Sequence, residues 1–150
     1  MKQQKTIIPS GHEIDKERST FELIVFKPII KSIRDQIQGV EDILRLNKTT
    51  AEAFDKKWKD FEDHEKCIAF EKLLVNAYNE GKVADWNDGN HKYSPRFDMR
   101  DDTFSYHHYN DWYCNSYSSA RLCFIGDDAY KNMIDATTKF LPQYKLSRLS

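Results

Sequence analysis

Aromatic side chains crowd one stretch of this 150-residue chain, and the spacing there fits neither a regular helix nor a regular strand. Half of the aromatic residues lie in about a quarter of the length: Trp86, Tyr93, Phe97, Phe104, Tyr106, Tyr109, Trp112, Tyr113, Tyr117 and Phe124. Aspartate, asparagine, histidine and glycine residues separate the rings. The segment is typical either of a small sheet or of a binding surface with polar-tipped rings, and the sequence leaves both open.

Helical spacing of apolar residues before this segment predicts short helices. Residues 30–46 predict two helices separated at Gly39, because glycine weakens a helix interior. Thr49 and Glu52 have the spacing of a capping box, in which each side chain bonds to the other residue's backbone N–H. We therefore expect a helix to begin at this point.

Two longer helices are predicted on either side of the aromatic segment. One covers residues 63–79 and ends at Gly81, which can adopt the left-handed conformation that closes a helix. The other covers residues 127–141, with Pro142 beyond its end. We expect the chain that follows to be frayed.

Strands are predicted in two places. Turn residues at positions 9–11 and the β-rich run 20–27 (TFELIVFK) predict an N-terminal hairpin that ends at Pro28. Both faces of run 20–27 are apolar, so we expect both to be covered. Short strands at 93–99, 104–109 and 121–125 predict a small antiparallel sheet. The fold class is then α+β, in a single domain over residues 1–150: an N-terminal β-hairpin, central helices, an aromatic-rich sheet and a C-terminal helix.

Overall composition argues against several classes of function. The formal net charge is -1 with both signs mixed, so no global field attracts nucleic acid or an anionic membrane. The sequence has no apolar run long enough to span a bilayer and no apolar secretory signal, which predicts a cytoplasmic protein. Three cysteines, Cys67, Cys114 and Cys123, fit reduced thiols better than a disulfide framework.

Three segments resemble passages in a group of short proteins from phages and prophages of gut Bacteroidetes. They read IIPSGHEIDKERSTFELIVFKPI, WNDGNHKYSPRFDM and SSARLCFIGDDAYKN. The similarity covers the hairpin, the aromatic segment and the start of the last helix, which is roughly half of the chain. Where the group tends to read Tyr-Pro-Trp-Phe, this chain has Ser94 to Phe97, with Arg96 in place of the tryptophan. The group carries no established activity. The resemblance implies a mobile-element origin and an accessory or virion-associated role.

Two metal interpretations find weak support. Residues 85–90 (DWNDGN) offer alternating oxygen ligands, as a calcium loop does, but Arg96 stands where a bidentate glutamate should close the site. The simpler interpretation is a turn in which aspartate and asparagine side chains bond to the local backbone. His107 and His108, with His91 or a cysteine, lack the paired spacing of zinc ligands, and neighbouring strand residues point to opposite faces. We expect no metal and no cofactor.

The aromatic segment supports three hypotheses. Tyrosine, tryptophan and arginine anchor protein interfaces, so the favoured one is a non-catalytic protein that binds a protein partner through residues 85–125. The residues predicted to make contact are Trp86, Tyr93, Arg96, Tyr106, Tyr109, Trp112 and Tyr113. The second hypothesis is stacking of the same rings on single-stranded nucleic acid, although the acidic residues of the segment outnumber its basic residues. The third is a small cysteine- or metal-dependent enzyme built around His107, His108, Cys114 and Cys123, with a carboxylate such as Asp111 orienting a histidine.

Overall fold

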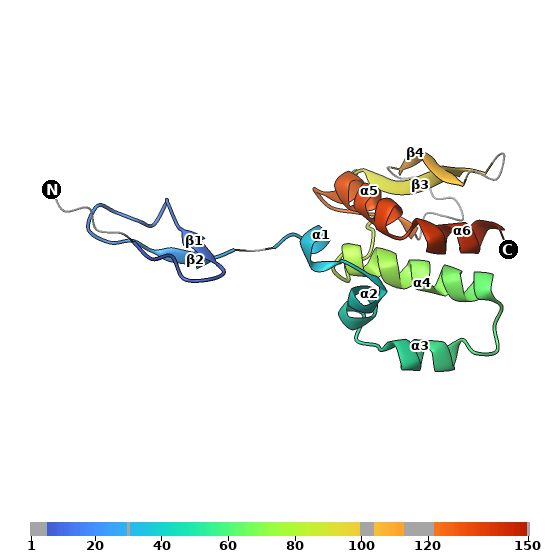
Figure 1. Cartoon of the computed structure of the whole chain (residues 1–150). Coiled ribbons are helices and arrows are strands. Elements are labelled where there is room, and N and C mark those ends of the chain that lie inside the picture. Colours follow the sequence, from blue (N-terminus) through green and yellow to red (C-terminus); the bar gives the residue numbers. More distant parts are fainter. Residues whose placement is uncertain (1–5, 30, 100–103, 113–121, 150) are drawn as a thin grey trace. The chain divides into compact units, whose positions relative to one another are not determined.

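The computed structural model describes residues 6–29, 31–99, 104–112 and 122–149. Tyr113, Cys114 and Tyr117 lie outside these ranges. The chain divides into two compact units, Met1–Ser32 and Ile33–Ser150, and each is described by itself (Figure 1). Both contain β structure and the second holds the helices, so the predicted α+β fold class is confirmed. The single domain over residues 1–150 stays a prediction.

The first unit is the expected hairpin, with shorter strands than predicted. Strand β1 (His12–Ile14) pairs antiparallel with β2 (Phe26–Pro28), and Pro28 is the last paired residue, as expected. Most of run 20–27 is loop, and Phe21 is fully exposed, so the prediction of a strand covered on both faces was wrong. Hydroxyl groups explain the loop: Thr20 accepts a hydrogen bond from the N–H of Leu23, and Ser19 accepts one from the N–H of Val25.

The second unit is built around one long helix (Figure 1). That helix, α4 (Asp63–Tyr78), has α2 (Val40–Leu46) and α3 (Ala51–Lys57) on one side. On its other side lie α5 (Ala129–Lys139), α6 (Leu141–Leu149) and a hairpin of β3 (Lys92–Asp98) and β4 (Ser105–Trp112). A short helix, α1 (Ile33–Gln36), precedes α2. None of the helices in the described ranges is long and apolar enough to cross a membrane.

Helix ends follow local chemistry, with one shift from the prediction. Gly39 separates α1 from α2, as expected. The cap of α3 is Thr50 rather than Thr49: its hydroxyl accepts the N–H of Ala53 at 3.2 Å. The helix therefore begins where expected, but the predicted capping box of Thr49 and Glu52 was wrong, because Ala53 has no side-chain acceptor to complete a box with Thr50. Beyond α4 the backbone is left-handed at Glu80 (φ +53°) as well as at the predicted Gly81 (φ +75°), and the N–H of Gly81 donates to the carbonyl of Asn76 at 2.9 Å, so the left-handed stop begins one residue earlier than predicted.

The chain beyond residue 141 is helical, so the prediction of a frayed tail was wrong. Pro142 is the second residue of α6, where its missing N–H costs nothing because the first turn has no helical acceptor for it. The proline therefore starts a new helix instead of only ending the previous one. Tyr144 of α6 is buried in the core, which ties this helix down.

The predicted antiparallel sheet is present and has an additional contact. β3 and β4 pair from Lys92 opposite Trp112 to Asp98 opposite Ser105. Of the predicted third strand, the described part contributes a single bridge, in which Tyr93 and Phe124 exchange hydrogen bonds of 3.0 and 2.7 Å. The sheet packs on a core drawn from α2 to α6 and from Phe124 of the bridge. Its large helical members include Ile43, Phe54, Phe70, Leu74, Tyr78, Met133, Phe140 and Tyr144.

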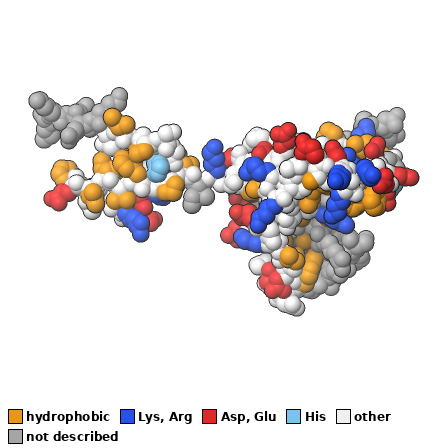
Figure 2. Space-filling view, turned by 90° about the horizontal axis from the view of Figure 1, so that it is seen from below, with side chains coloured by type: hydrophobic (Ala, Val, Ile, Leu, Met, Phe, Trp, Pro, Cys, Tyr) orange, Lys and Arg blue, Asp and Glu red, His pale blue; other side chains and the backbone are white. Residues whose placement is uncertain are grey.

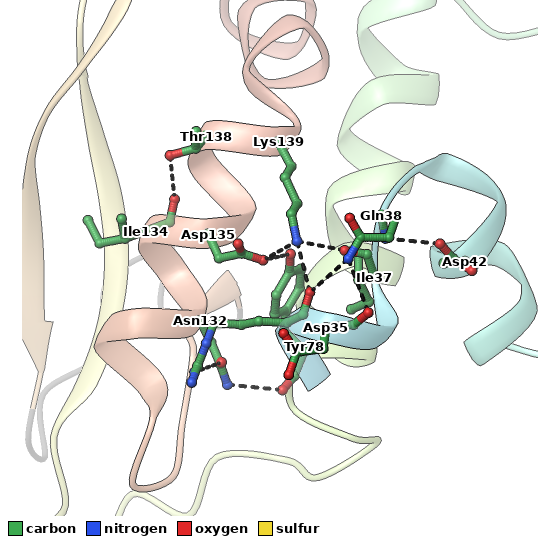
Figure 3. A network of polar contacts seen from close by, with 11 residues as sticks. Asp35, Ile37, Gln38, Asp42, Tyr78, Asn132, Ile134, Asp135, Thr138 and Lys139 are labelled. Carbon is green, nitrogen blue, oxygen red and sulfur yellow. Dashed lines mark hydrogen bonds and ion pairs between the residues drawn. The ribbon is translucent and has the colours of Figure 1, made fainter. Parts of the chain in front are cut away.

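A polar network connects α1 to α5 (Figure 3). The ammonium of Lys139 donates to the backbone carbonyls of Arg34 and Ile37, at 2.8 and 2.7 Å. Asp135 accepts from Lys139 at 2.9 Å and from the hydroxyl of Tyr78 at 2.7 Å. The lysine thus satisfies carbonyls at the C-terminal end of α1 that the short helix leaves without helical donors.

Candidate functional site

Three tyrosines from three elements form a cluster at the surface of the second unit. Tyr93 lies on β3, Tyr109 on β4 and Tyr130 in the first turn of α5. Their ring centroids are 5.1 to 5.7 Å apart, and each pair meets edge to face. Tyr93 and Tyr109 are half-buried, and Tyr130 is 44% exposed. We call these three residues the tyrosine cluster.

Strand register explains why the two strand tyrosines meet. Tyr93 stands opposite Asp111, and Tyr109 stands opposite Pro95, so the two rings are diagonal neighbours on one face of the hairpin. α5 packs against β3 and brings Tyr130 onto the same face. The cluster therefore depends on packing between segments that are distant in sequence.

A histidine and an aspartate border the cluster. The Nδ1 atom of His91 lies 2.8 and 2.7 Å from the two carboxylate oxygens of Asp111. The imidazole also stacks on Tyr93, with centroids 5.9 Å apart and planes 10° from parallel. The aspartate therefore orients an accessible imidazole beside the rings, which leaves that group able to contact a bound molecule.

A register shift extends the aromatic face along β4. Arg96 stands opposite His108 and Phe97 opposite Tyr106, so His107 has no opposing residue in the ladder. The extra residue places Tyr106 and Tyr109, three positions apart, on the same face. Burial raises the pKa of Tyr106, and the nearby hydroxyls of Tyr130 and Tyr109 raise it further.

Of the predicted contact residues, the structure brings Tyr93, Tyr106 and Tyr109 together. Arg96 is exposed on β3 at the register shift. Trp112 is the last residue of β4, and its side chain is outside the description, as is all of Tyr113. Contact of these residues with a partner stays a prediction.

Trp86 lies outside the tyrosine cluster, in the loop of residues 85–90 whose alternating oxygen ligands resemble those of a calcium loop. The ammonium of Lys92 donates to the carboxylate of Asp88 at 2.7 Å and to the carbonyl of Asn90 at 2.8 Å, and it lies 5.3 Å from the ring centroid of Trp86. Asp88 also accepts the N–H of Asn90, as expected for a turn closed by its own side chains. These contacts lower the pKa of Asp88 to about 2, with the Lys92 hydrogen bond as the largest cause. A lysine therefore supplies the positive charge in this loop.

The described cysteines lack the features of an activated thiol. Cys123 is 2% exposed, and burial raises its pKa. Cys67 is half-buried on α4, and its pKa is raised by burial and by the nearby carboxylates of Asp63 and Glu71. Cys114 lies outside the described residues. Within those residues no group of three or more histidine, cysteine, aspartate or glutamate side chains is placed to hold a metal ion.

Sequence reasoning missed Tyr130 and the pairing of His91 with Asp111. In the sequence, Tyr130 has helical spacing with Met133 and Ile134, which is typical of a buried stripe, whereas its ring is 44% exposed and contacts Tyr93 and Tyr109 of the hairpin. The pairing follows from the register that sets Tyr93 opposite Asp111, which no short-range pattern reveals. No known protein family, curated protein or solved structure gives a significant match to this chain.

Proposed function

We propose that this protein is a non-catalytic module that binds a protein partner through the tyrosine cluster and the aromatic side chains around it. The proposal rests on one observation: the rings of Tyr93, Tyr109 and Tyr130 contact one another and are still partly exposed to solvent. Tyrosine presents a large contact area with few rotatable bonds and keeps a polar tip, so it binds proteins at low entropic cost.

Rigidity supports the same conclusion. Tyr93 is held by backbone bonds to Phe124 on one side and by the β3–β4 pairing on the other. His91 is fixed by Asp111 and stacks on the Tyr93 ring. A surface whose side chains are already ordered loses less conformational freedom on binding.

Charge favours protein over single-stranded nucleic acid as the partner. The carboxylate of Asp111 lies at the border of the cluster, where a negative charge repels phosphate. Figure 2 looks at the second unit from below, on the side of α2 and α3 rather than that of the β3–β4 hairpin, and shows acidic and basic side chains interspersed there. Mixed charge of this kind suits complementary protein surfaces and gives only weak attraction to a polyanion.

The resemblance to phage and prophage proteins supplies the biological setting of the proposal. An accessory protein of a mobile element acts on components of the host or of the phage particle. The partner is then a host or phage protein, met in the cytoplasm of the host cell or on the virion.

Quantitative affinity capture tests the proposal. The tagged full chain is expressed in host cells, and the captured proteins are compared with those of Tyr109→Ala and Tyr130→Ala variants. A specific partner should lose roughly tenfold or more in affinity with each variant, as central interface tyrosines do. Phe61→Ala is the matched control, because Phe61 is 50% exposed and lies outside the cluster.

Two results would reject the proposal. One is a partner that binds both tyrosine variants as tightly as the unchanged chain. The other is binding of a labelled single-stranded oligonucleotide that both variants abolish and that falls steeply between low and moderate salt, which would favour the nucleic-acid hypothesis instead.

A further inference from the structure

The tyrosine cluster has a fixed carboxylate on its border, that of Asp111. This residue stands directly opposite Tyr93 and two positions after Tyr109 on β4, so the three side chains leave the hairpin on the same face. The Asp111 side chain is 32% exposed. Both of its oxygens contact one nitrogen atom of His91, and a carboxylate accepts about four hydrogen bonds, so this contact leaves room for further donors.

Basic side chains on the neighbouring elements do not neutralise this surface. Lys92 and Arg96 alternate with Tyr93 along β3 and so belong to the opposite face of the strand. Lys92 is also buried, with its ammonium bonded within the loop before β3. In the first turn of α5, Lys131 pairs with Asp128 at 3.2 Å. Over the described residues of β3, β4 and that first turn, no lysine or arginine is therefore both unpaired and on the face of the cluster.

Tyrosine rings and a carboxylate attract the same kind of group. The face of an aromatic ring carries a negative partial charge and attracts cations, arginine more often than lysine. A guanidinium is planar, so it can stack on a ring while its edge donates N–H groups to a carboxylate. An ammonium is compact and more strongly hydrated, and it cannot stack in this way.

We infer that the partner presents an arginine side chain to the tyrosine cluster, with its guanidinium stacked on the exposed part of the rings and donating to Asp111. This inference rests on the proposed function and names the chemistry of the contact. The rings supply most of the contact area. The carboxylate selects the charge, because it is on the same face as the rings and is held in place by His91.

Three peptides that differ in one side chain test the inference on the full chain. They are acetyl-Gly-X-Gly-amide with arginine, lysine or citrulline as X; citrulline keeps the planar shape of arginine without its charge. In NMR titrations at low ionic strength and pH 8, the arginine peptide should shift the ring signals of Tyr109 and Tyr130. It should bind more tightly than the other two peptides by roughly threefold to tenfold.

The Asp111→Asn variant removes the charge and keeps the size of the side chain. It should bind the arginine peptide no more tightly than the citrulline peptide. Asp60→Asn is the matched control, because its side chain is 80% exposed and it lies outside the cluster, so this variant should keep the preference for arginine. A captured partner protein should lose at least threefold in affinity with Asp111→Asn, and the loss should shrink as salt is added.

The results separate this inference from the proposed function. A captured partner that is weakened by Tyr109→Ala and Tyr130→Ala but binds Asp111→Asn as tightly as the unchanged chain overturns the arginine contact and leaves protein binding intact. A partner that both tyrosine variants bind normally rejects the two together. The arginine contact is also overturned if the arginine peptide shifts no ring signal of the cluster, or if the lysine or citrulline peptide binds the unchanged chain equally tightly.

Discussion

Two buried tyrosines show how one hydroxyl group can stabilise or destabilise this core. The hydroxyl of Tyr78 donates to Asp135 at 2.7 Å. The hydroxyl of Tyr144 is buried and has no hydrogen-bond partner in the described structure. Burial raises the pKa of both phenols, so both stay protonated at neutral pH.

The same substitution at these two positions should have opposite effects. Tyr144→Phe removes an unsatisfied group and should raise the free energy of unfolding by about 1 kcal/mol, while Tyr78→Phe removes a donor to a carboxylate and should lower it by about 1–2 kcal/mol. Urea denaturation followed by circular dichroism measures both changes. A Tyr144→Phe variant that is less stable than the unchanged chain would show that the hydroxyl has a partner, such as bound water.

Because of Asp88, the free energy of unfolding should fall when the pH is lowered below about 4. Its carboxyl has a pKa of about 2 in the folded chain against an ordinary 3.8, because Lys92 and the Asn90 N–H hold the charged form. A depressed pKa gives stability that is fully present above pH 3.8 and is lost as the pH falls through 2. Unfolding measured between pH 4.5 and 2 should therefore show a smaller loss of stability in Asp88→Asn than in the unchanged chain.

Asp60→Asn is the control for this measurement, because Asp60 is largely exposed and, among the described residues, its carboxylate pairs only with Lys59, at a long 3.8 Å. An Asp88→Asn variant with the same pH dependence as the unchanged chain would contradict the assignment.

At the scale of single elements, α1 depends on a side chain from elsewhere. It has four residues, too few to be stable in isolation. Lys139 of α5 holds its carbonyls, and Asp135 holds Lys139 (Figure 3). In Lys139→Met we expect the Ile37 amide, which bonds to the Ile33 carbonyl, to exchange hydrogen at least about tenfold faster, since one or two hydrogen bonds are lost.

Lys131→Met provides the comparison, because Lys131 is exposed and pairs only with Asp128 of the described residues, at 3.2 Å. Equal exchange at Ile37 in both variants would mean that the lysine bonds do not hold α1. Native-state hydrogen exchange read by NMR distinguishes the two outcomes.

Elements with strong local signals were predictable, and those decided by distant contacts were not. Gly39 lies between α1 and α2 and Gly81 lies just beyond α4, as predicted, because the cost of glycine in a helix interior and its left-handed freedom act locally. The left-handed conformation of Glu80, one residue before Gly81, was not predicted. α6 was missed because Pro142 was interpreted only as a stop signal, although proline equally starts a helix. Of the predicted third strand, only Phe124 is paired in the described residues. Its partner Tyr93 is distant in sequence, so local sequence could not show how much of the strand would pair.

The tyrosine cluster was half predictable for the same reason. Tyr93, Tyr106 and Tyr109 stand out by composition in the aromatic segment. Tyr130 was hidden within the helical spacing of α5, and the pairing of His91 with Asp111 depends on strand register. Local sequence therefore indicated which strand residues to consider, but not which helix completes the surface.

At the scale of the whole molecule, the two units differ in what stabilises them. The buried apolar core lies within residues 37–144, all in the second unit. In the first unit the strands have three residues each, and large apolar side chains such as Ile7, Phe21 and Leu23 are exposed. A two-stranded hairpin without a covered face is at best marginally stable in water.

We therefore expect residues 33–150 to unfold cooperatively when expressed alone, and a peptide of residues 1–32 to show no cooperative transition. Thermal unfolding followed by circular dichroism provides the measurement on both fragments. A cooperative transition in the peptide, or none in the larger fragment, would contradict this division of stability.

The position of Lys92 has a consequence for how the loop before β3 responds to its surroundings. The counterion of Asp88 is attached to the backbone four residues away, so it can neither diffuse away nor be extracted by a chelator. A loop stabilised by a bound ion changes shape as the supply of that ion changes. This one should keep the same shape in calcium-rich and calcium-depleted media, and with it the placement of Trp86.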